Sequence, residues 1–289
     1  MKGVVVTGVS TGIGWGTAKV LIRHGIHVFG SVRKQGDAER LAAEFGAAFT
    51  PLLFDVTDEM AVQAAAQLVR ERLGGETLFG LVNNAGIATA GPLMHQPIEE
   101  IRYQIEVNLI GQLIVTRGFL PLLGTDRSLR GKPGRIVNVS SAGGKIAAPF
   151  IGAYAASKHA LEGLSESLRR ELLLYGIDVI IVGPGAVATP IWDKAEQIDV
   201  SAYAQTDYAE ILRRFSTYFV GEGRKGFPPE RIGETILQAL TSPSPRVRYA
   251  VVPQHFRNWT LPMVLPRRWI DATIARGLGL TQRRANGGG

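Results

Sequence analysis

The sequence has no cysteine and only five histidines among its 289 residues. Without cysteine there are no disulfide bonds, thiol nucleophiles or thiolate metal ligands, which is typical of a reducing compartment and predicts a cytoplasmic protein. The only close histidine pair, His24 and His27, flanks a glycine at an expected helix-to-strand turn. Surface positions are the simplest interpretation of this pair, so we expect no metal site.

Long apolar runs are also missing. No segment approaches about 18 uninterrupted apolar residues, the length that a membrane-spanning helix needs. The chain begins with an apolar strand-like run rather than with a basic stretch and an apolar leader. These features predict a soluble protein without a transmembrane segment, whose 45% hydrophobic residues suffice for a large core.

Acidic residues are scarce in the last quarter of the chain. The formal net charge is +7, yet residues 213–289 hold thirteen Lys and Arg against four Asp and Glu, which leaves the rest slightly acidic. No basic helix with interleaved aromatic residues accompanies this charge, so we expect no nucleic-acid partner. We interpret the basic quarter as a solvated face, with a weak contact to an acidic or membrane surface as the alternative.

Short apolar runs alternate with amphipathic helical stretches along the chain. Runs such as GVVVTG and GRIVNVSS lack an in-out alternation, which is typical of strands buried on both faces. The sequence therefore predicts an α/β fold, a Rossmann-like doubly wound and mostly parallel seven-stranded sheet with helices on both faces. The expected strands are 2–7, 26–32, 48–54, 78–83, 134–140, 177–182 and 247–252. We expect one domain, 1–280, followed by a flexible tail, 281–289.

The first strand passes into a helix through a glycine-rich turn, GVVVTGVSTGIGWGT. Such a turn lets the backbone approach a pyrophosphate, and the N-terminus of the next helix offers free N–H groups to it. The spacing T-G-x-x-x-G-x-G differs from G-x-G-x-x-G, and no Gly-Lys-Ser/Thr follows, which disfavours a kinase or NTPase. A purely structural turn is the alternative when this motif is taken alone.

Further motifs follow the glycine turn at ordered intervals, and together they resemble the short-chain dehydrogenase/reductase family from residue 1 to about 190, more loosely to about 252. The resemblance implies a Rossmann-type fold and hydride transfer between a nicotinamide cofactor and a carbonyl or alcohol carbon. The stretches that carry it are Asp55-Val56, Asn83-Asn84-Ala85-Gly86, Ser141 with Tyr154-Ala155-Ala156-Ser157-Lys158, and Pro184-Gly185 through Thr189.

Tyr154 and Lys158 are four residues apart in a segment with helical periodicity, so both side chains leave one face of a helix. A free tyrosine has a pKa near 10. We expect the lysine ammonium and an oxidised nicotinamide to lower the pKa of Tyr154 toward neutrality, which makes it the general acid/base.

Two more residues complete the catalytic set that the resemblance implies. Ser141 lies thirteen residues before Tyr154 at the expected end of a strand, and its hydroxyl is expected to orient the substrate oxygen. Ser140 is the local competitor, and no paired histidine supports a hydrolase nucleophile at either serine. Asn108 is implied to hold a water that links Lys158 to solvent, with an exposed polar residue as the alternative.

The resemblance also implies a cofactor site. The glycine turn would bind the pyrophosphate, Asp55 and Val56 the adenine, the segment after the fourth strand the ribose, and the turn after the sixth strand the nicotinamide. One departure is Gly183, where the family usually has asparagine. The implied cofactor-binding residues are Gly8, Ser10, Thr11, Gly12, Ile13, Gly14, Arg33, Asp55, Val56, Asn84, Ala85, Gly86, Tyr154, Lys158, Pro184, Gly185, Val187 and Thr189.

The end of the second strand indicates which cofactor binds. An acidic residue there holds the ribose hydroxyls of NAD and repels a 2′-phosphate. This chain has Val32 followed by Arg33 and Lys34, so we favour NADP(H), with NAD(H) as the alternative. Thr11 replaces an arginine that NADP-dependent members often carry in the glycine turn.

Aromatic residues gather between about 190 and 228, where the family has a substrate lid, and a C-terminal extension follows at 253–280. We expect a small-molecule carbonyl or alcohol substrate that is bulky and apolar, such as a steroid, retinoid or lipid. An NAD-dependent alcohol dehydrogenase and a non-catalytic dinucleotide sensor are the alternatives. The family usually forms dimers or tetramers through helices near 99–123 and 152–175, so we expect a homo-oligomer.

Overall fold

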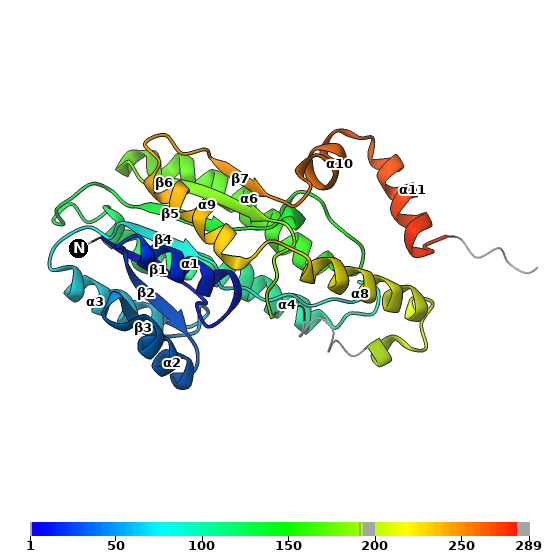
Figure 1. Ribbon diagram of the computed structural model, residues 1–289, viewed down its shortest axis with the longest axis horizontal. Coiled ribbons are helices and arrows are strands. Elements are labelled where there is room, and N and C mark those ends of the chain that lie inside the picture. Colours follow the sequence, from blue (N-terminus) through cyan, green and yellow to red (C-terminus); the bar gives the residue numbers. More distant parts are fainter. Residues whose placement is uncertain (1, 191, 193–199, 282–289) are drawn as a thin grey trace, which may run out of the picture.

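The structure is a computed structural model that describes residues 2–190, 192 and 200–281. Seven parallel strands form one sheet in the order β3-β2-β1-β4-β5-β6-β7, so the fold class predicted from the sequence is confirmed (Figure 1). Each predicted strand is present within two residues of its predicted bounds. The strands are β1 Gly3–Val6, β2 His27–Val32, β3 Phe49–Leu53, β4 Gly80–Asn83, β5 Arg135–Val139, β6 Asp178–Pro184 and β7 Arg248–Val251.

The central strands are buried on both faces. In β1 the side chains of Val4 and Val6 join one apolar cluster and that of Val5 joins the other, and all three are fully buried. Because neither face of such a strand contacts solvent, apolar side chains are favoured at every position, which explains the continuous apolar runs in the sequence.

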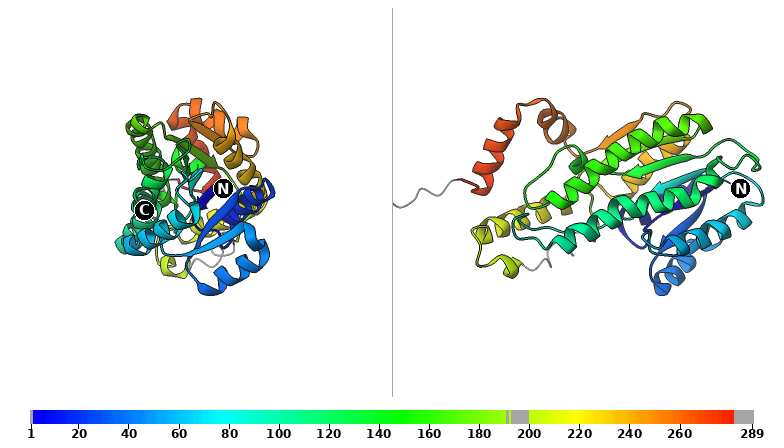
Figure 2. Two further views of the ribbon diagram at one scale, coloured as in Figure 1. Left: turned by 90° about the vertical axis from the view of Figure 1, so that its left-hand side faces the viewer. Right: turned by 180° about the vertical axis from the view of Figure 1, so that it is seen from behind.

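Helices cover both faces of the sheet (Figure 2). On one face α1, α2 and α9 supply the core residues, and on the other α3, α5 and the end of α6 do so. A π-helical segment, Glu106–Ile110, joins α4 to α5. The helices are α1 Gly12–Arg23, α2 Gln35–Phe45, α3 Glu59–Leu73, α4 Ile98–Ile105, α5 Gly111–Phe119, α6 Gly152–Glu171, α8 Ala209–Arg224, α9 Pro229–Thr241, α10 Leu261–Val264 and α11 Arg267–Leu278.

Helices α8, α10 and α11 lie at one end of the molecule, while the N-terminus lies toward the opposite end (Figures 1 and 2). Helix α8 belongs to the region expected as a substrate lid, and α10 and α11 belong to the expected C-terminal extension. Positions 191 and 193–199 of the lid lie outside the described residues, as does the expected tail apart from Thr281.

In the described part of the chain, the continuous helical run Ile98–Leu123 is long and apolar enough, by length and composition, to cross a membrane. Val107, Val115 and Phe119 of this run are buried in the core between the sheet and α3. The run is therefore built as a core helix, and its hydropathy reflects packing against the sheet.

Candidate active site

Tyr154 and Ser141 meet beyond the carboxyl end of β5. Tyr154 lies in the first turn of α6, and its hydroxyl is hydrogen-bonded to the side chain of Ser141. The strand ends at Val139, so Ser141 does not end the strand as predicted. Instead it begins the 3₁₀ turn Ala142–Gly144, where its Oγ accepts a hydrogen bond from the N–H of Gly143 at 3.0 Å.

The competing serine has a different environment. The Oγ of Ser140 is buried without a hydrogen-bond partner, and it lies where a side chain on Gly144 would clash with it at 2.6 Å. The structure thus brings Ser141 to Tyr154, as favoured from the sequence, and directs Ser140 into the protein.

Lys158 is buried one helical turn beyond Tyr154, with 4% of its surface exposed. Its ammonium donates a hydrogen bond to the carbonyl oxygen of Val139 at 2.9 Å and lies 5.9 Å from the centre of the Tyr154 ring. Burial lowers the pKa of Lys158 to about 8, against the opposing effect of the Glu162 carboxylate.

The expected direction of the Tyr154 pKa is wrong for the protein as the structure describes it. Burial raises the pKa of Tyr154 above its ordinary value, and the hydrogen bond with Ser141 opposes this only in part. The physical reason is that desolvation of the phenolate dominates, while the ammonium of Lys158 is directed to Val139. The phenol is therefore held in its protonated form at neutral pH.

Asn108 is fully buried within the π-helical segment, so the alternative of an exposed polar residue is wrong. Its Oδ1 accepts from the N–H of Ile87 at 2.8 Å, and its Nδ2 donates to the carbonyl of Ile87 at 2.9 Å and to Ser157 Oγ at 3.0 Å. A side chain on Gly86 would lie 3.1 Å from Asn108 Oδ1 and 3.8 Å from the Lys158 ammonium. Asn108 thus joins the segment after β4 to the helix that carries Tyr154 and Lys158.

The glycine turn is built for close approach. Gly8 and Gly12 have φ values of +70° and +61°, which residues with a side chain rarely adopt. A Cβ on Gly14 would lie 2.2 Å from the carbonyl oxygen of Gly8, so only glycine lets α1 begin against the turn. The first turn of α1 contains no acidic residue, and the side chain of Thr11 makes no capping bond. No side chain therefore caps the first turn of α1, and the binding of an anion by its N–H groups stays a prediction.

The N–H groups of Asn84 and Ala85 are already used within the protein. Both donate to Oγ1 of Thr7 at 2.9 Å, while Nδ2 of Asn84 donates to the carbonyls of Thr7 and Gly8. The implied contacts to a ribose cannot come from these N–H groups, because long-range packing commits them to the glycine turn. Thr7, the threonine that opens the glycine motif, is absent from the predicted set, although its hydroxyl ties the segment after β4 to the glycine turn.

Asp55 and Arg33 lie together at the carboxyl ends of β2 and β3. Asp55 Oδ1 accepts from the N–H and hydroxyl of Thr57, and Oδ2 lies 3.6 Å from the Arg33 guanidinium. Burial acts to raise the pKa of Asp55, but the bonds from Thr57 and the charge of Arg33 outweigh it and hold this pKa below its usual value. The ionised carboxylate suits an acceptor, and Val56 is buried beside it. Arg33 remains largely exposed and accessible to a phosphate.

The turn after β6 lies close to the glycine turn. Gly185 donates its N–H to the carbonyl of Val251 at 2.9 Å, directly after Pro184 ends the strand. A Cβ on Gly12 would lie 3.3 Å from the side chain of Thr189. Val187 is buried, and its carbonyl accepts from the Trp192 indole. The turn expected to bind the pyrophosphate and the turn expected to bind the nicotinamide therefore lie next to each other.

Arg40 is a second basic residue that sequence reasoning missed. It projects from α2, and its Nη2 donates to the carbonyl of Ser10 in the glycine turn at 2.7 Å. The guanidinium also pairs with Asp37 at 3.0 Å and Glu44 at 3.5 Å, so these carboxylates partly balance the positive charge that Arg40 places beside Ser10.

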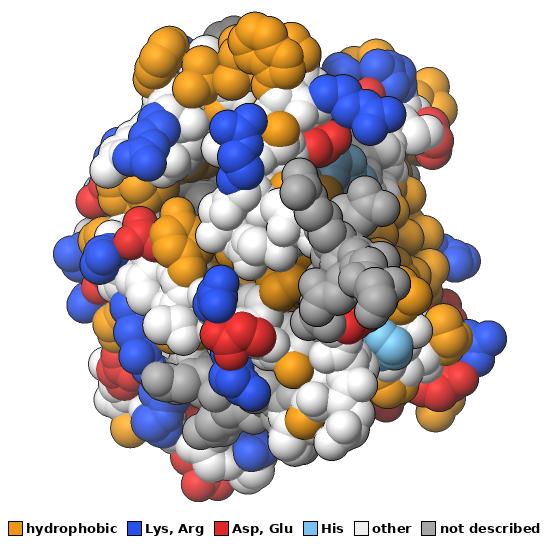
Figure 3. All heavy atoms as spheres, turned by 90° about the vertical axis from the view of Figure 1, so that its right-hand side faces the viewer, with side chains coloured by type: hydrophobic (Ala, Val, Ile, Leu, Met, Phe, Trp, Pro, Cys, Tyr) orange, Lys and Arg blue, Asp and Glu red, His pale blue; other side chains and the backbone are white. Residues whose placement is uncertain are grey.

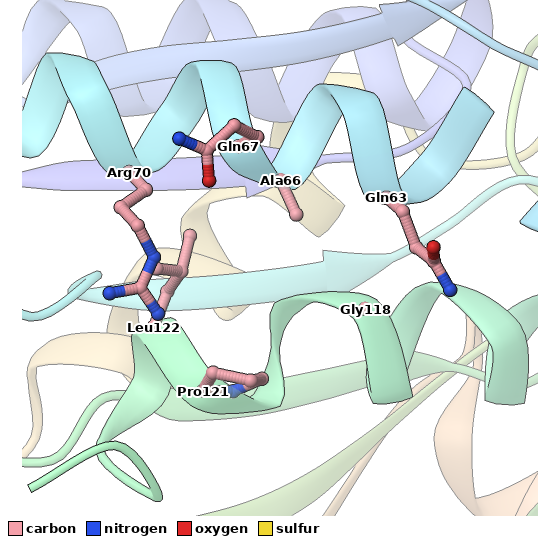
Figure 4. Close-up of a pocket in the computed structure, with 7 residues that line it drawn as sticks. All are labelled: Gln63, Ala66, Gln67, Arg70, Gly118, Pro121 and Leu122. Carbon is pink, nitrogen blue, oxygen red and sulfur yellow. The ribbon is translucent and has the colours of Figure 1, made fainter. Parts of the chain in front are cut away.

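A shallow cavity of about 170 Å³ lies elsewhere, between α3 and the end of α5 (Figure 4). The residues that line it are Gln63, Ala66, Gln67, Arg70, Gly118, Pro121 and Leu122, and none belongs to the predicted site. Within the described ranges there is no group of three or more His, Asp or Glu side chains that could hold a metal ion.

A tyrosine, a serine and a buried lysine at the carboxyl ends of parallel strands, beside a glycine-rich turn between strand and helix, are typical of a nicotinamide-dependent oxidoreductase. The comparisons specify the family. The model of the short chain dehydrogenase family matches residues 2–199, and the chain belongs to this family.

Similar proteins share both sequence and fold. The chain is 36% identical, over 96% of its length and 98% of the relative, to an NADPH-dependent 3-dehydrocapnine reductase of Ornithobacterium rhinotracheale. It is 32% identical to mouse retinol dehydrogenase 16, over 86% of this chain and 80% of the relative. A solved short-chain dehydrogenase from Streptomyces avermitilis superimposes with a TM-score of 0.74 at 26% identity, over 98% of both chains.

Proposed function

We propose that this protein is an NADPH-dependent reductase of bulky apolar carbonyl compounds, in which Tyr154 gives the proton to the substrate oxygen. The observation that carries the proposal is the position of Tyr154, which bonds to Ser141 on one side and packs against an apolar cluster on the other. This cluster contains Phe150, Ile151, Tyr203, Leu212 and Phe215.

The protonation state of Tyr154 suits the reduction of a carbonyl group. Burial keeps the Tyr154 phenol protonated, so it can donate as the carbonyl oxygen becomes negative. The Ser141 hydroxyl orients the same oxygen, and Lys158 stabilises the phenolate that remains. Bound NADPH supplies the hydride to the carbonyl carbon, and hydride and proton together give the alcohol.

The residues around the adenine end fit a 2′-phosphate. Arg33 is exposed, with Lys34 next to it and Arg40 reaching the glycine turn, while the position usual for an acid holds the buried Val32. The relative named for NADPH dependence supports this preference.

The substrate side is apolar and aromatic. Phe150 packs edge-to-face with Tyr208 and Phe215, and Phe215 stacks on Phe219 at 5.0 Å. Phe150 is held at φ +65°, an unusual backbone conformation at a position four residues before Tyr154. The relative named for retinol, an apolar alcohol, supports a substrate of this character.

The test is a series of methyl ketones of increasing alkyl length, followed by NADPH absorbance. We expect kcat/KM to rise about fourfold for each methylene that enters the apolar cluster. Activity limited to short polar ketones contradicts the substrate assignment. Faster turnover with NADH supports the NAD-dependent alternative, and NADPH binding without turnover of any carbonyl supports the dinucleotide sensor.

We further propose that the C-terminal extension lies on an anionic bilayer. None of the residues in the π-helical segment Phe256–Thr260, in α10 or in α11 is buried. Phe256, Val264 and Trp269 are 72%, 72% and 66% exposed. The extension also carries Arg257, Arg267, Arg268 and Arg276 against Asp271 alone.

Apolar side chains flanked by arginines match the interface of an anionic membrane. Figure 3 views this end of the molecule and shows hydrophobic side chains gathered along its upper edge, with basic side chains beside them. Leu278 and Leu280 of the same segment pack against the cluster next to Tyr154. The bilayer contact would therefore adjoin the entrance for an apolar substrate.

Sedimentation with vesicles tests the membrane contact. We expect the protein to bind vesicles rich in phosphatidylserine and not purely zwitterionic ones, and R267S/R268S to weaken binding about thirtyfold. The matched control is R169S/R170S on α6. Equal weakening in both variants, or vesicle-independent self-association that R267S/R268S abolishes, contradicts the proposal.

A homo-oligomer remains our prediction for solution. Tyr103 and Ile110 on the α4–α5 run and Leu173 and Leu174 after α6 are 50%, 38%, 70% and 72% exposed. These residues lie on the helices that the family uses for dimers. Light scattering on the purified chain tests the prediction, and a monomer at micromolar concentration contradicts it. The cytoplasmic location likewise stays a prediction.

A further inference from the structure

Arg248, on β7, makes a buried ion pair directly behind the catalytic residues. Its Nε donates to both carboxylate oxygens of Glu162, at 3.1 and 2.9 Å, and its Nη2 donates to Oε1 at 3.0 Å. The Glu162 side chain is 2% exposed and that of Arg248 is 16% exposed. A desolvated pair is costly unless its geometry is good, and this forked arrangement meets that condition.

The same guanidinium reaches the catalytic serine. Nη2 of Arg248 donates to the carbonyl oxygen of Ser141 at 3.3 Å, and the N–H of Gly144 donates to the same oxygen at 3.0 Å. Two donors from separate parts of the chain thus fix the peptide plane that follows Ser141. The side chain of Ser141 bonds to Tyr154, so the orientation of this residue matters for the reaction.

Gly183 makes room for the guanidinium. A Cβ at this position would lie 2.4 Å from Arg248 Nη2 and 3.0 Å from Cζ. Any larger residue, including the asparagine that the family usually has there, would displace Arg248. The departure at Gly183 and the ion pair therefore form one structural unit.

A fourth contact ties this unit to the C-terminal extension. The Cζ atom of Arg248 lies 4.4 Å from the centre of the Trp259 ring, a cation–π contact. Trp259 belongs to the π-helical segment Phe256–Thr260, which precedes α10. The arginine thus lies between the substrate-side extension and the turn that holds Ser141.

We infer that Arg248, fixed by Glu162, is a positioning residue that orients Ser141 toward Tyr154 and couples this orientation to Trp259. The catalytic part of the inference rests on the proposed reductase activity. The structural part, anchoring of the turn after β5, stands without it.

The charged groups around the pair extend its effect to Lys158. Tyr154, Lys158 and Glu162 follow one another at intervals of one helical turn on α6. The ammonium of Lys145, which follows the 3₁₀ turn, lies 3.4 Å from the Glu162 carboxylate. The carboxylate opposes the lowering of the Lys158 pKa by burial. Removal of the Glu162 charge therefore favours the neutral amine of Lys158.

Kinetics of R248K and R248M test the positioning role with the ketone identified above. We expect kcat to fall about tenfold in R248K, which keeps the charge but loses the fork, while KM for NADPH stays within about twofold. The control is R135M, because Arg135, at the amino end of β5, is similarly buried at 20% exposure and donates to the backbone carbonyls of Ala239 and Ser242 at the end of α9. Full activity of R248K and R248M, or an equal loss in R135M, overturns the inference.

The pH profile gives a readout that a purely structural role would not move. We expect E162Q to shift the alkaline decline of kcat/KM toward lower pH, because Lys158 then loses its proton more readily. The double variant E162Q/R248M removes both charges and guards against misfolding from one unpaired buried ion. An unchanged profile in E162Q contradicts the link to Lys158.

Hydrogen exchange tests the anchor without any substrate. We expect amide exchange across residues 140–146 to accelerate about tenfold in R248M and, through crowding of the guanidinium, in G183N, but not in R135M. W259L should give a smaller acceleration in the same segment. If these amides exchange as in the wild type, the anchor is wrong. If they accelerate while no carbonyl is turned over, the anchor holds and the proposed reductase function fails.

Discussion

The ammonium of Lys158 lies 2.9 Å from the carbonyl oxygen of Val139, the last residue of β5. This bond holds a buried charge at the carboxyl end of a central strand, one helical turn from Tyr154. The consequence is a lysine whose pKa falls to about 8 beside a phenol whose pKa is raised by burial. The pH dependence of the protein follows from these two opposite shifts.

Carbonyl reduction should be nearly independent of pH below about 7 and decline above about 8. The raised pKa of Tyr154 keeps its proton available, whereas Lys158 loses its charge as the pH passes about 8. Oxidation of the alcohol product needs the phenolate and should rise with pH over the same range. Rate profiles in both directions check this, and a reduction rate that increases up to pH 9 speaks against the assignment.

Replacement of Lys158 by methionine should raise stability at neutral pH while abolishing turnover. A lysine whose folded pKa of about 8 lies below its unfolded 10.5 opposes folding below pH 8, by about 3 kcal/mol. K158M also loses the hydrogen bond to Val139, which reduces the expected increase in the free energy of unfolding by about 1 kcal/mol. The cost of the ammonium fades between pH 8 and 10.5, so the advantage of K158M should shrink there.

Urea unfolding of K158M and wild type at pH 7 and pH 10 measures this difference. The exposed Lys132 provides the control, since K132M should change stability little at either pH. A variant less stable than wild type at pH 7 would show that the ammonium is better solvated than its burial indicates.

Y154F should lower kcat by about a thousandfold and leave the Kd for NADPH within about twofold. The substitution removes the proton donor but keeps the ring that packs against the apolar cluster. Single-turnover absorbance and NADPH fluorescence measure the two quantities. Y103F, at a half-exposed tyrosine of α4, serves as the control. Persistent turnover in Y154F would assign proton transfer to another group.

R33A should weaken NADPH binding about tenfold and change NADH binding little. The reason is the loss of one charge-assisted bond to the 2′-phosphate, a group that NADH lacks. Arg33 also faces Asp55, so the comparison of the two cofactors separates a phosphate contact from a general effect on the adenine pocket. R127A, at an exposed arginine of the loop between α5 and β5, is the control. Equal losses for both cofactors would remove the argument for NADP(H).

G14A should destroy cofactor binding and destabilise the fold, whereas G163A should stabilise it by about 1 kcal/mol. A Cβ at Gly14 meets the backbone oxygen of Gly8 at 2.2 Å, while a Cβ at Gly163 in α6 meets nothing within 4 Å. Thermal unfolding with and without NADPH checks both variants. A G14A protein that NADPH still stabilises would mean that α1 can shift without loss of the anion site.

Local patterns account for the parts of the site that were predicted from sequence. Tyr154 and Lys158 share a helix face because four residues make about one turn, and no other part of the chain can alter that. The glycine turn is also predictable from the local sequence, because the positive φ values of Gly8 and Gly12 are ones that glycine adopts readily. The exception is the strand end at Ser141, where boundaries depend on the ladder with β6.

Other features depended on partners far away in the chain. The N–H groups of Asn84 and Ala85 are committed to Thr7, which is 77 and 78 residues away in sequence. Asn108 is buried because the segment around Ile87 folds onto it, not because of its own helix. Neither contact has a signature in the spacing of the motifs.

The sequence by itself determined the alternation of strands and helices, the glycine turn and the helix face that Tyr154 and Lys158 share. Each of these depends on dihedral preferences and on spacings within a few residues. Only the tertiary structure decided the pKa direction of Tyr154 and the pairing of Arg248 with Glu162, which are 86 residues apart. Burial and long-range contact arise when the sheet brings β7 against β6 and α6. Desolvation and charge pairing are therefore properties of the folded chain.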